Sequence, residues 1–172
     1  MAPSLIRSEP YASEILDARD GRQEALNRAL GAGHAVTLFV SLNIPGREKT
    51  PAGAEAFFSR MSGCVGEEFP AAARLASSFD ALGPYLILGL DGDPSSVKRR
   101  CIELETAHPS SRLLDLDVYT PGGAQIGRAA LGLAARSCLV CDQRAVDCIR
   151  ARRHGFAEIV AKAHELLTPF RA

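Results

Sequence analysis

Two aspartates one residue apart, Asp115 and Asp117, are the residues whose type and spacing most directly suggest chemistry. They stand in the segment 112–119, RLLDLDVY, where apolar and acidic residues alternate. This alternation predicts a β-strand with its leucines and valine on the buried face and both aspartates on the other, about 7 Å apart at a rise of ~3.3 Å per residue. Carboxylates held on a rigid strand repel each other, and a divalent cation relieves that repulsion.

A carboxylate pair of this kind suits phosphoryl or nucleotidyl transfer. Mg²⁺ prefers one or two carboxylates together with phosphate oxygens and water, and a pair of such ions stabilises both the attacking and the leaving oxygen. We therefore predict that Asp115 and Asp117 are catalytic and bind Mg²⁺; the alternative is a solvent-facing pair on an ordinary sheet. Lys98, His108 and Arg112 lie just upstream. They would neutralise charge in the transition state, or else be surface charges, with His108 merely ending a helix.

A second group of residues has the composition of a metal site. Cys138, Cys141, Cys148 and His154 follow the spacing C-x2-C-x6-C-x5-H. Three thiolates and one imidazole form a closed tetrahedral zinc set, which would be structural because no coordination position is left open. Reduced cysteines without metal are the alternative. A redox role is disfavoured, because a redox C-x2-C normally opens a helix after a strand.

The composition argues against a nucleic-acid or membrane protein. The 172 residues are 47% hydrophobic and 23% charged, and 20 basic residues balance 20 acidic ones, so no overall field attracts DNA or lipid. Aromatic residues make up 6%, too few for a platform of stacked bases. We therefore expect no nucleic-acid and no membrane partner. The segment 128–154 holds six arginines and two aspartates, which indicates either a local anionic partner or a solvated face.

The cysteines and the amino terminus bear on the compartment. Five cysteines, an odd number, favour reduced thiols over a disulfide framework. The first residues, MAPSLIRSEPYASEI, lack the apolar run of a secretory signal. No segment approaches the ~20 apolar residues of a membrane span. We therefore expect a cytoplasmic protein.

The helices and strands predicted from the sequence must position these groups. Apolar periodicity in the first half predicts a helix at 11–30, a buried strand at 35–42, a helix through Met61 and a further helix through Phe69, Ala73 and Ala76. Gly21 is expected to break the first helix. Thr50 and Pro51 are expected to be the N-cap and first turn of the second.

The second half of the chain continues in the same manner. It predicts a strand at 85–90, a helix at 94–107, the aspartate strand at 112–119, a short strand after Gly122-Gly123 and a terminal helix at 156–170. Asp93 is expected to cap the helix that starts at Pro94. Helices that alternate with short strands indicate one α/β or α+β domain over residues 1–172.

Taken together, these stretches resemble the apo-citrate lyase phosphoribosyl-dephospho-CoA transferases, the holo-acyl-carrier-protein synthases of citrate lyase. Four segments carry the resemblance in the family's order: ILDARDGRQEAL (15–26), SLNIPGREK (41–49), KRRCIELETAHPSSRLLDLDVY (98–119) and RSCLVCDQRAVDCIRARRH (136–154). The resemblance implies an α+β, nucleotidyltransferase-like fold with a central mixed sheet flanked by helices. It also implies a Cys-rich carboxy-terminal module at about 136–155.

The resemblance further implies the reaction and the partners. The phosphoribosyl-dephospho-CoA group would pass from triphosphoribosyl-dephospho-CoA to a serine of the acyl carrier subunit of citrate lyase, and pyrophosphate would leave. The aspartate pair would be the metal-binding catalytic residues, and the cysteine–histidine stretch falls in a matching segment of the family. Carried over onto this sequence, the substrate- or phosphate-binding residues are Arg19, Arg22, Lys49, Lys98, His108 and Arg112. One departure is Ser110-Ser111, which stands where the family usually has Leu-Gly.

Other interpretations stay open. A related transferase could serve another acyl carrier protein, such as that of malonate decarboxylase. A non-catalytic zinc-knuckle module could instead bind RNA or protein through three arginines, Arg150, Arg152 and Arg153. A third metal carboxylate would come from one of three acidic residues, Asp91, Asp93 or Glu105.

Overall fold

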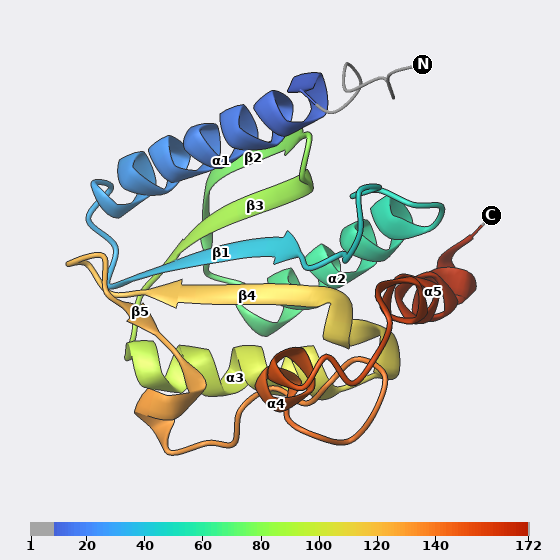
Figure 1. The fold of residues 1–172 in the computed structure, drawn as a ribbon. Coiled ribbons are helices and arrows are strands. Elements are labelled where there is room, and N and C mark those ends of the chain that lie inside the picture. Colours follow the sequence, from blue (N-terminus) through green and yellow to red (C-terminus); the bar gives the residue numbers. More distant parts are fainter. Residues whose placement is uncertain (1–8, 172) are drawn as a thin grey trace.

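The computed structural model describes residues 9–171 and is built on one five-stranded sheet (Figure 1). The strand order is β2 (Ala73–Asp80), β3 (Gly83–Leu90), β1 (Val36–Leu42), β4 (Leu114–Tyr119) and β5 (Gln125–Ile126). The helices are α1 (Glu9–Leu30), α2 (Ala54–Glu68), α3 (Pro94–Thr106), α4 (Ala145–Arg150) and α5 (Phe156–Leu167), with 3-10 turns at Pro109–Leu113, Arg128–Leu131 and Thr168–Phe170. Residues 1–8, on which part of the secretory-signal expectation rests, lie outside the described residues.

All neighbouring strands in this sheet run antiparallel. The α+β class is therefore confirmed, but the predicted mixed sheet is wrong. After β1 the chain passes through α2 to the edge strand β2, and β3 then returns beside β1 as the second arm of a hairpin. A hairpin places consecutive strands in opposite directions, whereas a parallel neighbour would need a helical crossover.

The helices lie on both faces of the sheet and enclose two apolar clusters. On one face α1 packs over β1, β2 and β3 (Figure 1). Its apolar residues there meet Phe39, Tyr85 and Ile87. On the opposite face α2, α3 and α5 cover the larger cluster, which includes the inward-facing residues of β4. Within the described residues no helix has both the length and the apolar character needed to cross a membrane.

The strand that carries the aspartates was predicted correctly in position and in orientation. β4 alternates buried and half-buried residues, with Leu114, Leu116 and Val118 in the large cluster. Asp117 lies opposite Phe39 of β1, which belongs to the cluster under α1. Directly opposed residues of an antiparallel pair point to the same face, so both aspartates lie on the face that α1 shares.

Two helix predictions in the first half of the chain are wrong. Gly21 does not break α1, because the helix is held on the sheet by buried residues on both sides of that glycine, and Gly21 itself is exposed. The segment through Phe69, Ala73 and Ala76 is not a helix, because β2 starts at Ala73 and pairs with β3. Alanine spacing suggested helix there, but the pairing with a neighbouring strand overrides such a weak local preference.

The start of α2 lies three residues later than predicted. Its N-cap is Gly53, not Thr50, and Gly53 has φ 91°. A Cβ at Gly53 would lie 2.7 Å from the carbonyl oxygen of Leu167, at the end of α5. The close approach of these two helix ends therefore requires glycine here. The predicted cap of α3 is confirmed, since Asp93 accepts hydrogen bonds from the Ser96 N–H at 2.8 Å.

Candidate functional site

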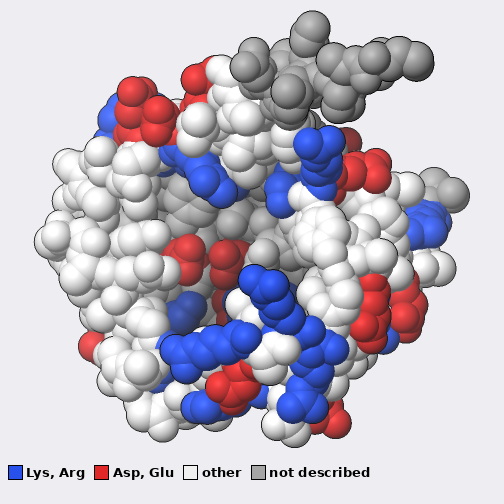
Figure 2. Space-filling view, viewed as in Figure 1, with Lys and Arg blue, Asp and Glu red and all other residues white. Residues whose placement is uncertain are grey.

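Asp115 and Asp117 open into a cavity of about 360 Å³ beside the free edge of β4. Both side chains are half-buried and belong to neither apolar cluster, although Tyr119 on the same face packs against the cluster under α1. Figure 2 shows this side of the molecule hollowed, with acidic side chains in the floor of the hollow and basic ones along its lower rim. The predicted arrangement of the pair on one accessible sheet face is thus present.

The environment of the pair disfavours the charged form of Asp117. Burial and the neighbouring charge of Asp115 raise the pKa of Asp117 to about 6. Gln125 of β5 partly offsets this by donating a hydrogen bond from Nε2 to Asp117 Oδ1 at 2.6 Å. Burial, followed by the charges of both aspartates, raises the pKa of Tyr119 to about 12. A half-buried carboxylate beside a second carboxylate is a group whose charged form a bound cation would stabilise.

A buried glutamate lies beside the pair and closes the edge of the strand. β5 pairs with β4 only near Val118 and Tyr119, so the backbone groups of Leu116 have no strand partner on that side. Glu105 of α3 accepts the Leu116 N–H at 3.0 Å, and Lys98 of α3 donates to the Leu116 carbonyl. This pair of α3 side chains replaces the missing ladder bonds, which buried backbone groups require.

Glu105 is only 2% exposed and is surrounded by cations. Its carboxylate oxygens lie 3.9 Å from Lys98 Nζ and 3.0 Å from the guanidinium nitrogens of both Arg128 and Arg136. The Leu116 N–H and Arg128 hydrogen-bond this carboxylate and Arg136 pairs with it, so Glu105 is already engaged by protein groups. Of the other two open choices, Asp91 is exposed and Asp93 is engaged in capping α3.

Arg136 connects the buried glutamate with the aspartate pair. Its Nη2 lies 3.0 Å from Glu105 and 3.3 Å from Asp115. Sequence reasoning counted Arg128 and Arg136 only within a basic segment and did not consider Gln125. One signal was available: Lys98 and Glu105 are seven residues apart, hence on the same face of α3. No such spacing in the sequence indicated that Gln125, Arg128 and Arg136, which follow β4, would contact this site.

Of the six residues predicted to bind substrate or phosphate, Lys98 alone is among the described residues that line the aspartate cavity. Arg22 instead forms a bidentate pair with Asp80 at 2.7 and 2.8 Å and also donates to the Gly83 carbonyl, so it fastens α1 to the β2–β3 hairpin. Lys49 donates to the Ile44 carbonyl at 2.9 Å. Burial, and then the nearby charge of Arg19, lower the pKa of Lys49.

The remaining two predicted residues have structural contacts. His108 is exposed and caps the 3-10 turn Pro109–Leu113, where its Nδ1 accepts the Ser110 N–H at 3.2 Å. Arg112 donates to the Ser137 carbonyl at 3.0 Å and to the Cys138 carbonyl, so it fastens the cysteine-rich segment to the sheet.

The Ser110-Ser111 pair is not in a position to cradle a phosphate. Both serines are 2% exposed. The Ser110 hydroxyl donates to the Leu166 carbonyl at 2.7 Å and so joins the turn before β4 to α5. At the position where the family usually has Leu-Gly, this chain therefore has two serines packed inside the fold.

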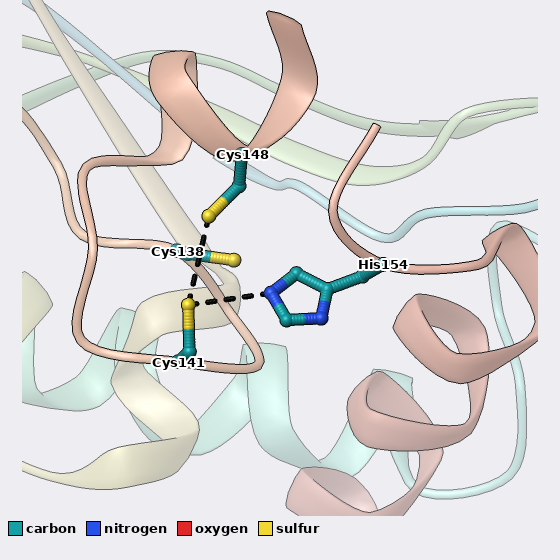
Figure 3. Close-up of side chains that lie close together, drawn as sticks. All are labelled: Cys138, Cys141, Cys148 and His154. Atoms are coloured by element: carbon teal, nitrogen blue, oxygen red, sulfur yellow. Dashed lines mark hydrogen bonds between the residues drawn. The ribbon is translucent and has the colours of Figure 1, made fainter. Parts of the chain in front are cut away.

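The cysteine cluster has the geometry of a metal site (Figure 3). Cys138, Cys141, Cys148 and His154 present one ligand atom each, and all four atoms lie within 4.8 Å of one another. Cys141 Sγ lies 3.5 Å from Cys148 Sγ and 3.2 Å from His154 Nε2. Sulfur ligands around a tetrahedral zinc at ~2.3 Å would be about 3.8 Å apart. The cluster could therefore hold a metal such as zinc with little movement.

The surroundings of the cluster also fit a cation. The Gln143 N–H, and then the His154 side chain, lower the pKa of Cys141 to about 7, which favours its thiolate. His154 Nδ1 lies 3.4 Å from a Glu158 carboxylate oxygen of α5. A carboxylate on the far nitrogen of a histidine orients the ring and makes it a stronger metal ligand. α4 supplies Cys148, and the segment before α5 supplies His154, so a metal would tie these two helices together (Figure 3).

Comparison with known proteins identifies a family whose pattern covers most of this chain. The pattern of the family described as apo-citrate lyase phosphoribosyl-dephospho-CoA transferase matches residues 11–170. A protein of that name from Citrobacter koseri is 39% identical over 95 residues, which are 55% of this chain and 50% of the relative. Proteins of the same name from Escherichia coli O139:H28 and O9:H4 are 37% and 36% identical over 92 residues, 54% of this chain and 50% of theirs. The chain spans about half the length of the curated relatives it matches.

Proposed function

This chain belongs to the apo-citrate lyase phosphoribosyl-dephospho-CoA transferase family, and on that premise we propose that it attaches the phosphoribosyl-dephospho-CoA group to a serine of the acyl carrier subunit of citrate lyase. The donor is triphosphoribosyl-dephospho-CoA, and pyrophosphate is the second product. The names of the relatives support this choice of group and acceptor. The proposal also includes a nucleotidyltransferase-like arrangement, in which an acidic pair on a strand binds the metal that contacts the phosphates.

The observation that carries the proposal is the carboxylate pair in its basic cavity. Asp115 and Asp117 share one face of β4, and Lys98, Arg128 and Arg136 line the same cavity. Burial, followed by the charge of Asp115, raises the pKa of Asp117, so a bound cation would stabilise its ionised form. Such a donor set fits Mg²⁺, which prefers one or two carboxylates and takes its remaining ligands from phosphates and water.

In the proposed reaction the carrier's serine oxygen bonds to the phosphorus nearest the ribose. The bond from this phosphorus to the bridging oxygen breaks, pyrophosphate departs with that electron pair, and the serine proton is released. Mg²⁺ would offset the charge that develops on the phosphate oxygens. Arg128 and Arg136 each carry five N–H donors, of which Glu105 and Asp115 use only some, and the rest can bind the triphosphate. Glu105 keeps both guanidinium groups in place for this.

The roles of the other predicted residues follow from their contacts. Lys98 is proposed to act on the phosphates through its charge beside Asp117, because its ammonium is already bonded to the Leu116 carbonyl. Arg19 and Lys49 are proposed as a second, outer phosphate contact. The charge of Arg19 contributes to the lowered pKa of Lys49, so the two cations lie near each other. Arg22 and Arg112 are proposed to support the site indirectly, through the β2–β3 hairpin and the cysteine-rich segment.

We further propose that Cys138, Cys141, Cys148 and His154 bind a structural zinc ion. All four positions of a tetrahedral site come from the protein, so none is open for catalysis. The five cysteines form no disulfide, and thiols that stay reduced suit a cytoplasmic protein.

The decisive experiment is intact-mass spectrometry of an apo acyl carrier subunit of citrate lyase incubated with the enzyme, Mg²⁺ and triphosphoribosyl-dephospho-CoA. The carrier should gain the mass of the phosphoribosyl-dephospho-CoA group, and pyrophosphate should appear in equal amount. Asp117→Asn should leave the carrier unmodified, while Asp91→Asn, at an exposed position before α3, should act like the wild type. The carrier of malonate decarboxylase serves as a second acceptor. Faster modification of that carrier, or modification of neither, contradicts the proposal.

A further inference from the structure

A second and larger cavity lies between the cysteine-rich segment, α5 and the turn that follows β1. It measures about 460 Å³. We infer that this pocket, called here the knuckle pocket, binds the adenosine diphosphate part of the dephospho-CoA arm of the donor while the triphosphate lies at the aspartates. The inference deepens the proposed function and rests on it.

The lining of the knuckle pocket combines apolar and basic side chains. Leu139, Ile149, Phe156 and Ile159 contribute its apolar surface. Ile149 is 74% and Phe156 68% exposed, so two large apolar side chains face solvent around an open cavity. Exposed apolar groups beside a concave surface mark binding sites, and volumes of ~300–1,000 Å³ are usual for ligands of this size.

The charges around the knuckle pocket favour an anionic ligand. Arg112, Arg136 and Arg152 line it, and the described lining residues include no aspartate or glutamate. Arg112 bonds to carbonyl and hydroxyl oxygens only, so its charge is not cancelled by a carboxylate among the described residues. Arg152 makes no ion pair with a described residue. A flat apolar base flanked by guanidinium groups suits an adenine ring with its attached diphosphate.

The knuckle pocket adjoins the aspartate cavity through one side chain. Arg136 lines both, and its guanidinium lies 3.3 Å from Asp115. A donor with phosphates at the aspartates can therefore extend past Arg136 into the apolar pocket without leaving the protein surface. The long donor of the proposed reaction has this composition, a triphosphate at one end and a nucleotide arm attached to its ribose.

A helix of the carrier protein is the rival occupant, and the shape of the site disfavours it. α4 has only six residues, of which Cys148 is buried, whereas a specific protein contact buries ~800 Å² on each partner. The feature beside α4 is a concave pocket of small-molecule size. A small anionic ligand therefore matches the site better than a protein surface does.

The test uses dephospho-CoA alone as the probe, titrated into the metal-loaded protein by calorimetry. Wild-type protein should bind it, and the probe should compete with the donor in the transfer assay. Ile149→Glu places a carboxylate at the pocket and should weaken probe binding by about tenfold or more. Val146→Glu is the matched control, because Val146 is 38% exposed on the same helix but outside the pocket lining. Ile149→Ala, without a new charge, should weaken binding less.

The outcomes separate this inference from the proposed function. Normal probe binding by Ile149→Glu, together with a raised KM for the carrier, would assign the pocket to the carrier and overturn the inference. Equal effects of Ile149→Glu and Val146→Glu on probe binding, with intact turnover in the wild type, would also overturn it and leave the proposed function standing. Position-specific probe binding without any transfer to a carrier would support the pocket as a nucleotide site and count against the proposed reaction.

Discussion

Glu105 of α3 accepts the backbone N–H of Leu116, the residue between the two aspartates of β4, at 3.0 Å. The same carboxylate pairs with Arg128 and Arg136, which come from the segment after the sheet. One buried side chain therefore positions both the strand that carries the acidic pair and the cations that face it. The relationship makes Glu105 a positioning residue for the proposed site.

Glu105→Gln should destabilise the protein by about 3–5 kcal/mol, because it removes the buried carboxylate that Lys98, Arg128 and Arg136 share. Urea denaturation measures this loss. Glu103→Gln, at an exposed position of the same helix, is the control and should change stability little. Equal stability of the two variants would show that Glu105 does not hold the cluster together.

Asp117→Asn should reduce prosthetic-group transfer by about 100-fold or more, because the site loses one of the two carboxylates proposed to bind Mg²⁺. Stability should not fall. The native environment disfavours the charged carboxylate, so a neutral amide relieves repulsion with Asp115 and should raise the melting temperature of the metal-free protein. Loss of activity accompanied by unfolding would contradict this prediction, and thermal melts beside the mass assay decide it.

The stability of the protein without Mg²⁺ should depend on pH through Asp117. Burial and Asp115 raise its pKa from 3.8 to about 6 in the folded state. Between these values the folded chain binds more protons than the unfolded chain, so stability falls as pH rises, by on the order of 1–2 kcal/mol from this group. The difference between wild type and Asp117→Asn, measured by denaturation across this range, isolates the effect. Saturating Mg²⁺ should remove this fall in wild-type stability with pH, because the ion stabilises the ionised carboxylate.

Glu158→Gln should lower zinc affinity about 10- to 100-fold, because the carboxylate on His154 Nδ1 orients the imidazole toward the cysteines. Competition with a chromogenic chelator measures the affinity. The control is Glu165→Gln on the same helix, whose partner is Lys162 rather than a member of the cluster. If both variants keep wild-type affinity, Glu158 does not orient the histidine.

Arg22→Gln should cost about 1–3 kcal/mol of stability and leave the KM for the donor unchanged, since Arg22 is bonded to Asp80 and the Gly83 carbonyl. The sequence resemblance predicts instead that Arg22 binds phosphate. A KM raised at unchanged stability would favour that role, so denaturation and steady-state kinetics on one variant distinguish the two.

Several features followed from local sequence because their causes are local. The alternation in 112–119 fixed which face of β4 holds the aspartates, since successive side chains of a strand point to opposite faces. Asp93 and Pro94 marked the start of α3, because a cap needs only its neighbouring N–H groups. The spacing of three cysteines and one histidine likewise indicated a cluster, which the structure brings within ligand distance.

Other features depended on partners distant in the chain. Residues 73–80 form an edge strand because β3 provides hydrogen-bond partners for their backbone. No local sequence pattern predicts that pairing. Arg22, His108 and Arg112 contact a hairpin, a turn and the cysteine-rich segment. Their expected substrate-binding roles stay predictions. A long cationic side chain binds whichever acceptor the fold places within its reach, and the sequence does not show that acceptor.

The sequence by itself determined the acidic pair, the metal-ligand set and the family of the chain, because each is encoded in residue types at short spacing. Only the tertiary structure decided that Glu105 would be a buried anchor rather than a metal ligand and that Arg136 would join two cavities. Those roles arise where α3, β4 and the segment after β5 meet. Charges that are far apart along the chain acquire a defined interaction only when folding removes the water between them.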